Sequence, residues 1–218
     1  MTARAEARLW QLISAAAPVG AFHYSQGLES AIDRRWVADV AGLRQWLTAH
    51  LMLVLARLDM PVISRVMDAW REGNEARVHD LDALAIACRE AREVRDEQRQ
   101  MGHAIGRLAR GLEEPYPARD LGYTVAFGVL AANRAVPCRS ALAGFAFAWC
   151  ENQIVAAQKL MPIGQIAGQQ LLTELVGHLD QAVAEALDCD YDAIGLCIPH
   201  ASIASALHET QYSRLFRS

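Results

Sequence analysis

The sequence lacks the features that mark secreted, membrane-spanning and nucleic-acid-binding proteins. Its five cysteines are odd in number and widely scattered, which favours reduced thiols in the cytosol over a disulfide framework. No stretch reaches the ~18 uninterrupted apolar residues that cross a bilayer, and the N-terminus, which carries Glu6, has no apolar signal-peptide core. With 21 basic and 25 acidic residues, the chain also lacks the basic excess that phosphate-backbone binding needs. We therefore expect a cytoplasmic protein with no membrane and no nucleic-acid partner.

Residues that favour strands are scarce. Threonine occurs 5 times, against 39 alanines and 25 leucines. Alanine and leucine lose little entropy in a helix, whereas β-branched residues prefer strands. The 218 residues are 53% apolar, which is enough for a substantial core. We predict a single all-α domain over residues 1–218, a bundle of about eight to ten helices.

The apolar spacing predicts where the helices lie. The clearest pattern follows Asp39, a plausible N-cap, and runs to Leu58, and Pro61 then begins a helix that ends near Arg71. A long helix is expected over residues 80–111, and its charged middle, residues 89–99, is expected to be a solvated, ion-paired face rather than a partner surface. Other helices are expected over residues 4–17, 119–133, 140–159, 163–187 and 201–218.

No complete catalytic or metal motif is present. There is no glycine-rich loop that ends in Gly-Lys-Ser/Thr. His208-Glu209 begins a metalloprotease-like pattern, but Tyr212 stands where the second histidine would be. Cys189, Cys197 and His200 cluster in sequence without matched metal-ligand spacing. We predict no catalytic residues, no cofactor and no metal, and a metal-dependent helical enzyme is the third-ranked alternative.

Two segments are not explained by a core alone. In Phe22–Gln26 (FHYSQ), aromatic and polar residues alternate beside a turn at Pro18 and Gly20. Such a segment either anchors a partner or packs an aromatic side chain at the start of a helix. In Trp149–Gln153 (WCENQ), polar residues interrupt an apolar helix and need hydrogen-bond partners if they are buried. Lys159 follows near that helix's C-terminus, where the macrodipole favours a cation, which is one explanation of its position. The alternative is an exposed lysine that meets a partner.

The end of the chain is the third unusual segment. Residues 208–218 hold Tyr, Phe, Leu and two arginines among the last seven residues. Tyrosine and arginine are enriched at binding hot spots. The composition therefore indicates either a tail that becomes ordered on a partner or a tail that docks on its own domain.

These segments resemble the urease accessory protein UreF family. The closing eleven residues, HETQYSRLFRS, are the most specific match, and the matching stretches follow the family's order over nearly the whole chain. The stretches are Pro18–Phe22 through Ser25–Glu29, Arg92–Gly102 (REVRDEQRQMG), Phe147–Gln153, Lys159–Gln169 (KLMPIGQIAGQ) and His208–Ser218.

The resemblance implies a non-enzymatic, all-α chaperone that forms a homodimer. Family members bridge a urease-docking accessory protein of the UreD/UreH type and a nickel-carrying GTPase of the UreG type. The assembly inserts nickel into the carbamylated-lysine centre of apo-urease. An alternative is a GTPase-activating protein that supplies Arg214 or Lys159 in trans.

The resemblance also implies which residues bind partners. Phe22, where some members have tyrosine, and Arg214 correspond to contacts with the GTPase, and Lys159 corresponds to GTPase coupling. We expect a C-terminal partner-binding tail over residues 201–218, and within it His208–Ser218 corresponds to a segment that docks the urease-binding accessory protein and becomes ordered on binding. The partner-binding residues that we expect are Phe22, Tyr24, Gln26, Lys159, Glu209, Tyr212, Arg214, Leu215, Phe216 and Arg217.

Overall fold

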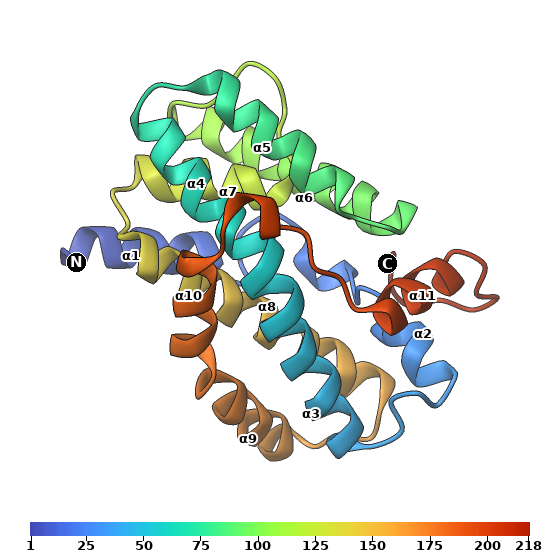
Figure 1. The fold of residues 1–218 in the computed structure, drawn as a ribbon. Coiled ribbons are helices and arrows are strands. Elements are labelled where there is room, and N and C mark those ends of the chain that lie inside the picture. The colour runs from blue at the N-terminus through green and yellow to red at the C-terminus, as the bar shows by residue number, and fades with distance from the viewer.

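Every regular element of the chain is helical. The computed structural model describes residues 1–218 (Figure 1). Its α-helices are α1 (Ala3–Ile13), α2 (Leu28–Asp33), α3 (Val40–Ala49), α4 (Met60–Arg71), α5 (Glu75–Ala87), α6 (Arg92–Gly111), α7 (Tyr123–Asn133), α8 (Cys138–Leu160), α9 (Gln165–Val176), α10 (Leu179–Asp188) and α11 (Pro199–His208). The predicted fold class, a single all-α domain, is confirmed.

A continuous helix over Val40–Arg71 runs through the centre of the molecule. It consists of α3, a π-helical segment over His50–Asp59, and α4. The sequence predicts two separate helices here, and that prediction is wrong because the chain does not break at Pro61. In the π-helical geometry the N–H of Met60 bonds the carbonyl of Leu55, and the proline falls in the first turn of α4.

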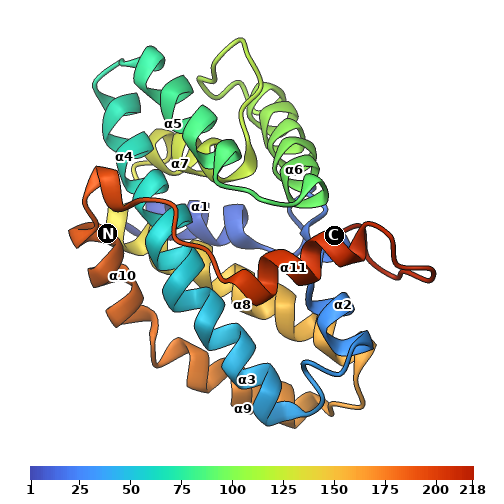
Figure 2. The same ribbon diagram turned by 45° about the vertical axis from the view of Figure 1, so that its right-hand side comes forward.

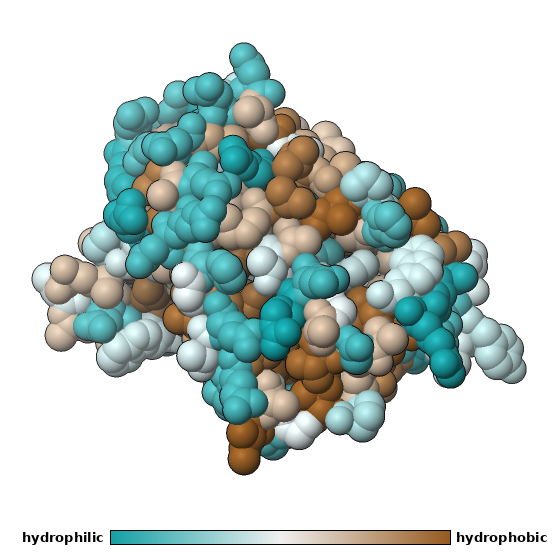
Figure 3. Space-filling model, turned by 60° about the horizontal axis from the view of Figure 1, so that its bottom comes forward, coloured by the Kyte–Doolittle hydropathy of each residue, from teal (hydrophilic) through white to brown (hydrophobic).

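This central helix has the length and apolar composition of a membrane span, but 61% of its most apolar window is buried within the fold. Its α4 half packs against α7 and α8, and its π-helical segment packs against α10. Fully buried Leu47, Leu51, Ile63 and Met67 are part of one contiguous apolar cluster. We therefore assign Val40–Arg71 as the core helix of the bundle. On the face shown in Figure 3, exposed apolar residues form small patches among hydrophilic ones.

The long helix expected over residues 80–111 is two helices. Asn74 caps α5, which therefore begins earlier than predicted, and α5 ends at Ala87. The chain then turns and buries Arg89, which forms an ion pair with buried Asp59. Arg95 donates to the carbonyl oxygens of the turn, at 2.6 Å from Arg89 O and 2.9 Å from Glu90 O. The buried pair explains why the helical pattern is interrupted.

The charged stretch of α6 is only partly solvated, so the predicted ion-paired outer face is wrong for its inner members. Glu97 and Gln98 are buried because α6 packs on α7 on one side and contacts α11 on another. Further along, a Cβ on Gly102 would lie 2.0 Å from the carbonyl oxygen of Leu121. Glycine at this position lets α6 approach the start of α7 closely.

Three other predicted helices end early or are broken. The helix expected over residues 4–17 ends at Ile13. The run over residues 163–187 is broken at Gly177 and His178, which separate α9 from α10. The tail helix expected over residues 201–218 ends at His208. The last ten residues are not helical and fold back against α2 and α6 (Figure 2). The N–H groups of Leu215, Phe216 and Arg217 are bonded to Glu29 and His23 instead of to carbonyls of a helical turn.

Candidate functional site

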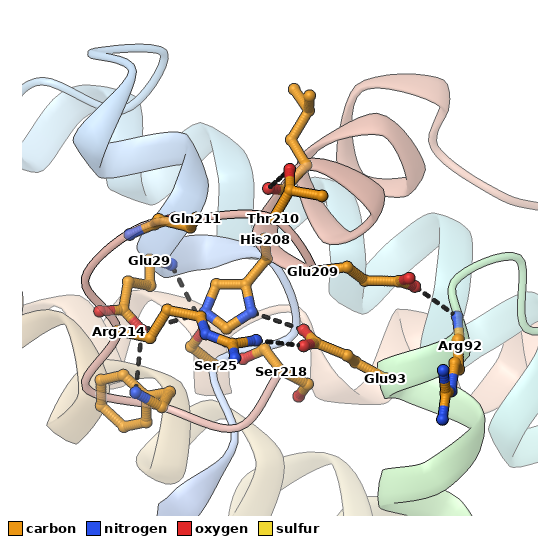
Figure 4. Close-up of polar contacts among 12 residues, drawn as sticks. Ser25, Glu29, Arg92, Glu93, His208, Glu209, Thr210, Gln211, Arg214 and Ser218 are labelled. Atoms are coloured by element: carbon orange, nitrogen blue, oxygen red, sulfur yellow. Dashed lines mark hydrogen bonds and ion pairs between the residues drawn. The ribbon is translucent and has the colours of Figure 1, made fainter.

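Glu29 of α2 holds the C-terminal segment by its backbone. Its carboxylate accepts hydrogen bonds from the N–H of Leu215 at 2.7 Å and from the N–H of Phe216 at 2.9 Å. The same carboxylate lies 3.1 Å from Nε2 of His208, the last residue of α11 (Figure 4). Glu29 and Phe216 are both buried, so these bonds are shielded from water.

Glu93 of α6 holds the same segment from the opposite side. Its carboxylate lies 2.6 Å from Nδ1 of His208 and 2.6 Å from a guanidinium nitrogen of Arg214 (Figure 4). His208 is fully buried, and each of its ring nitrogens faces a carboxylate. An imidazolium donates from both nitrogens, so its charged form would satisfy both carboxylates. The pair Glu29 and Glu93, with His208 between them, forms what we call the tail anchor.

The final residues continue this attachment. The carbonyl oxygen of Ser218 accepts from the N–H of Ser25 at 2.8 Å and from its hydroxyl at 2.6 Å. The Ser218 hydroxyl donates to Glu97 at 2.7 Å. The N–H of Arg217 donates to the carbonyl of His23 at 2.8 Å. The end of the chain is therefore joined to the Phe22–Gln26 turn and to α6.

Glu209 caps α6 from a distance in sequence. Its carboxylate accepts a 2.8 Å hydrogen bond from the N–H of Arg92, the first residue of α6. The N-cap position itself is Ala91, which has no side chain able to do this. A carboxylate at a helix N-terminus also interacts favourably with the helix dipole. Glu209 thus stabilises α6, in addition to its predicted role in partner binding.

The expected partner-binding residues divide by burial. Tyr24 and Phe216 are buried, and Gln26 is half-buried. Gln26 accepts from the indole N–H of Trp149 and donates to Glu97, each at 2.7 Å. These three residues are therefore placed to hold the neighbouring exposed residues in position. The exposed ones are Phe22, Lys159, Glu209, Tyr212, Arg214, Leu215 and Arg217.

The three unusual segments of the sequence meet in the structure. The amide of Asn152 donates to the carbonyl of Ala21 at 3.0 Å, which satisfies a polar group of α8 and fixes the Phe22 turn. The ammonium of Lys159, the only lysine of the chain, lies 5.5 Å from the ring centre of Phe216. Of the two alternatives for the tail, the structure has it docked on its own domain. Its partner-binding role stays a prediction.

Sequence reasoning missed the tail anchor. Glu29 and Glu93 lie within the matched stretches, but nothing in the sequence shows that a carboxylate on α2 meets N–H groups 186 and 187 residues later. In the sequence, His208 begins both the matched closing stretch and an incomplete metalloprotease-like pattern, and neither indicates that it lies between two carboxylates.

An apolar cavity of about 250 Å³ opens beside Phe22, between the end of α1 and α8. Its polar lining includes Asp59, Arg89 and Glu97. No group of three or more His, Cys, Asp or Glu side chains is arranged to hold a metal ion, and Cys189, Cys197 and His200 do not form one.

Burial raises the pKa of Glu97 to about 7, although hydrogen bonds from Gln26 and Ser218 lower it in part. Because this folded-state pKa lies above the unfolded value of 4.5, the protonated carboxyl favours the folded state. Its contribution is complete below about pH 4.5 and is lost as the pH rises through about 7.

We therefore expect Glu97→Gln, whose amide oxygen still accepts from Gln26 and whose amide nitrogen requires the Ser218 hydroxyl to accept instead of donate, to remove this pH dependence. Urea denaturation from about pH 5 to pH 8 should show the parent losing about 2–3 kcal/mol relative to the variant across that window. Parallel curves for the two proteins would show that Glu97 does not titrate in this range.

The protein is an all-α bundle whose C-terminal segment is docked on its own domain. The residues expected to bind partners lie on this segment and on the parts of the fold around it. Residues 37–176 match the family model of UreF. The chain is 46% identical to the urease accessory protein UreF of Chromohalobacter salexigens, over 97% of this chain and 94% of that protein. It is 40% identical to the UreF of Alkalilimnicola ehrlichii, over 98% and 96%, and 42% identical to that of a Marinomonas species, over 97% and 93%. The chain belongs to the urease accessory protein UreF family.

Proposed function

We propose that this protein is a non-enzymatic scaffold that bridges a urease-docking accessory protein and a nickel-carrying GTPase, so that nickel reaches apo-urease. One observation carries the proposal. The docked tail contacts the Phe22 turn through Arg217 and the end of α8 through Phe216 and Lys159. The tail, which carries Arg214, therefore lies next to the Phe22 turn and to Lys159, although these residues are far apart in sequence.

The exposed residues around the docked tail support two separate binding surfaces, one for each partner. Phe22 is 50% exposed and Leu215 is 62% exposed, although both side chains are large and apolar. Exposed apolar and arginine side chains of this kind are typical anchors of protein interfaces. We assign Phe22, Lys159 and Arg214 to the GTPase, and the outer side of the tail, with Tyr212 and Leu215, to the urease-docking protein.

We also propose that the scaffold acts as a homodimer in the cytoplasm. A dimer presents each partner-binding surface twice, which raises the effective concentration of one partner for the other. Light scattering of the purified chain tests this directly. A monomer at all accessible concentrations would remove the dimer from the proposal without affecting the two partner surfaces.

The scaffold role is favoured over GTPase activation by the pairing of Arg214. Its guanidinium is bonded to Glu93 at 2.6 Å, whereas an arginine finger must be free to reach a transferring phosphate. Single-turnover GTP hydrolysis by the GTPase, with and without this protein, discriminates the two roles. Stable complex formation with little acceleration supports the scaffold, and acceleration on the order of 10³-fold or more supports the activating protein.

Substitution Arg214→Ala should weaken recruitment of the GTPase by about tenfold or more, because an interface arginine is a frequent hot spot. The helical circular dichroism should stay unchanged, since Arg214 is exposed. Affinity can be measured by titration calorimetry with the purified GTPase. The matched control is Arg139→Ala, an exposed arginine on the first turn of α8. Equal affinities for the two variants would refute the assignment.

A further inference from the structure

A second hollow lies beside the Phe22 turn, between that turn, α6 and the tail. Its volume is about 470 Å³. All of its charged or titratable lining side chains except the Tyr24 phenol are basic, and no carboxylate lines it. These basic residues are His23, Arg99, His103, Arg107 and Arg217. Such a concentration of one sign is unexpected in a chain whose formal net charge is −4. We call this feature the basic hollow.

Two of the arginines in the basic hollow have no counter-ion. Arg99 is paired with Asp96 at 3.1 Å, and His103 with Asp120 at 2.6 Å, from outside the lining. Arg107 has no carboxylate partner, and the Arg217 guanidinium bonds only neutral groups, the amide oxygen of Gln100 at 3.3 Å and the Tyr24 phenol. By contrast, Arg214 on the same segment is paired with Glu93. The positive charge of Arg107 and Arg217 is therefore left uncompensated within one concave surface.

The neighbouring hollow shows that this arrangement is not general for the region. That hollow shares Tyr24, Gln100 and Arg217 with the basic hollow, but its lining also includes the carboxylates of Glu93, Asp96 and Glu209. Of these two hollows, only the basic hollow has no carboxylate in its lining, and Arg217 borders both.

From these observations we infer that the basic hollow binds a small phosphate-bearing molecule. Guanidinium groups present forked donors that match the oxygens of phosphate, and the resulting charge-assisted hydrogen bonds are strong. The volume falls in the range of small-molecule sites. We favour a small ligand over an acidic protein segment because basic groups from the Phe22 turn, α6 and the tail line one hollow of small-molecule size.

The tail contributes a ligand-binding residue in a fixed position. The N–H of Arg217 is bonded to His23, and its neighbour Ser218 is bonded to Ser25 and Glu97. Only the side chain of Arg217 is left to move. A phosphate held between Arg107 of α6 and Arg217 would remove the repulsion between them and join the tail more firmly to α6. Ligand binding is thus expected to protect the tail, and this expectation does not depend on the proposed scaffold role.

The test is titration calorimetry of the full chain with inorganic pyrophosphate and, separately, with ADP, at low ionic strength. We expect saturable one-site binding that is weakened about tenfold or more in Arg107→Gln and in Arg217→Gln, each of which removes an exposed cation. Arg139→Gln serves as the matched control and should bind as the parent does. Equal binding of both probes indicates recognition of phosphate alone, and tighter binding of ADP indicates a nucleotide; both support the proposal.

Three results would overturn it. The first is the absence of saturable binding of either probe. The second is an equal loss of affinity in Arg139→Gln, which would show nonspecific charge screening. The third is tighter binding of a poly-glutamate peptide than of pyrophosphate, with the same dependence on Arg107 and Arg217, which would assign the basic hollow to an acidic protein segment. A second readout is trypsin cleavage in the tail, which pyrophosphate should slow in the parent but not in Arg107→Gln.

Discussion

Replacement of Glu29 by alanine is expected to release residues 209–218 from the body of the protein and to destabilise the fold by about 3–5 kcal/mol. The substitution leaves the buried N–H of Phe216 and Nε2 of the buried His208 ring without their partner, while Nδ1 of His208 keeps Glu93. Each buried polar group that loses its partner costs about 1–3 kcal/mol. Urea denaturation gives the loss of stability, and limited trypsin digestion reports release of the tail through cleavage after Arg214 and Arg217.

Two variants make this prediction specific. Glu29→Gln keeps one side-chain oxygen as an acceptor and should lose less stability than Glu29→Ala. Glu72→Ala removes an exposed glutamate at the end of α4 and should change stability by less than about 0.5 kcal/mol. An unchanged trypsin pattern in Glu29→Ala would contradict the assignment of Glu29 as part of the tail anchor.

The same variant separates the two proposed partner surfaces. The tail surface depends on the anchor, since Leu215 and Phe216 are held by Glu29. The Phe22 turn has an independent support in the hydrogen bond from Asn152 to Ala21. Arg214 lies on the released segment, whereas Phe22 and Lys159 do not, so we expect Glu29→Ala to weaken binding of both partners and to impair the urease-docking protein more than the GTPase. The reverse order would show that the two surfaces are assigned wrongly.

The helices were largely predictable because they depend on local patterns. The apolar spacing after Asp39 located the central helix, and Asp39 does cap it, with a 2.8 Å bond from the N–H of Gly42. The errors fall where a distant contact decides the local structure. The break after Ala87 exists because Arg89 turns inward to Asp59, 30 residues earlier, and a charged residue in a helical pattern gives no sign of that.

The sequence indicated which segments belong to the site but not which residues hold them together. Composition and the resemblance selected the Phe22 turn, Lys159 and the tail, and the structure brings these segments together. The residues that assemble them are glutamates, which in sequence are typical of solvated surfaces. Only the three-dimensional arrangement shows that Glu29 and Glu93 enclose His208, because their partners lie on a segment more than 100 residues away.

Breaking the buried pair of Asp59 and Arg89 should have the other large effect. Both side chains are at least nine-tenths buried, and Asp59 also accepts a 2.6 Å hydrogen bond from the hydroxyl of Thr124. We expect Arg89→Met to cost about 3–5 kcal/mol of stability, because it leaves the Asp59 carboxylate buried with one neutral donor. Chemical denaturation at constant pH measures the loss.

The double variant Asp59→Leu/Arg89→Met decides whether an unpaired charge is the cause. Removing both charges should restore part of the stability, because Thr124 still has Gln98 as an acceptor at 3.1 Å. A double variant no more stable than Arg89→Met alone would exclude this explanation.

Arg89 also connects the core to the titration of Glu97. Its positive charge is one of the influences that lower the pKa of Glu97, against the larger effect of burial. Without it, that pKa should rise further, and the pH range in which stability falls should move upward in Arg89→Met relative to the parent. Glu97 accepts a hydrogen bond from the hydroxyl of Ser218, so the charge of Arg89 would affect how firmly the end of the chain is attached. A pH profile of tail cleavage by trypsin, compared between parent and Arg89→Met, tests this coupling, and identical profiles would show that it is absent.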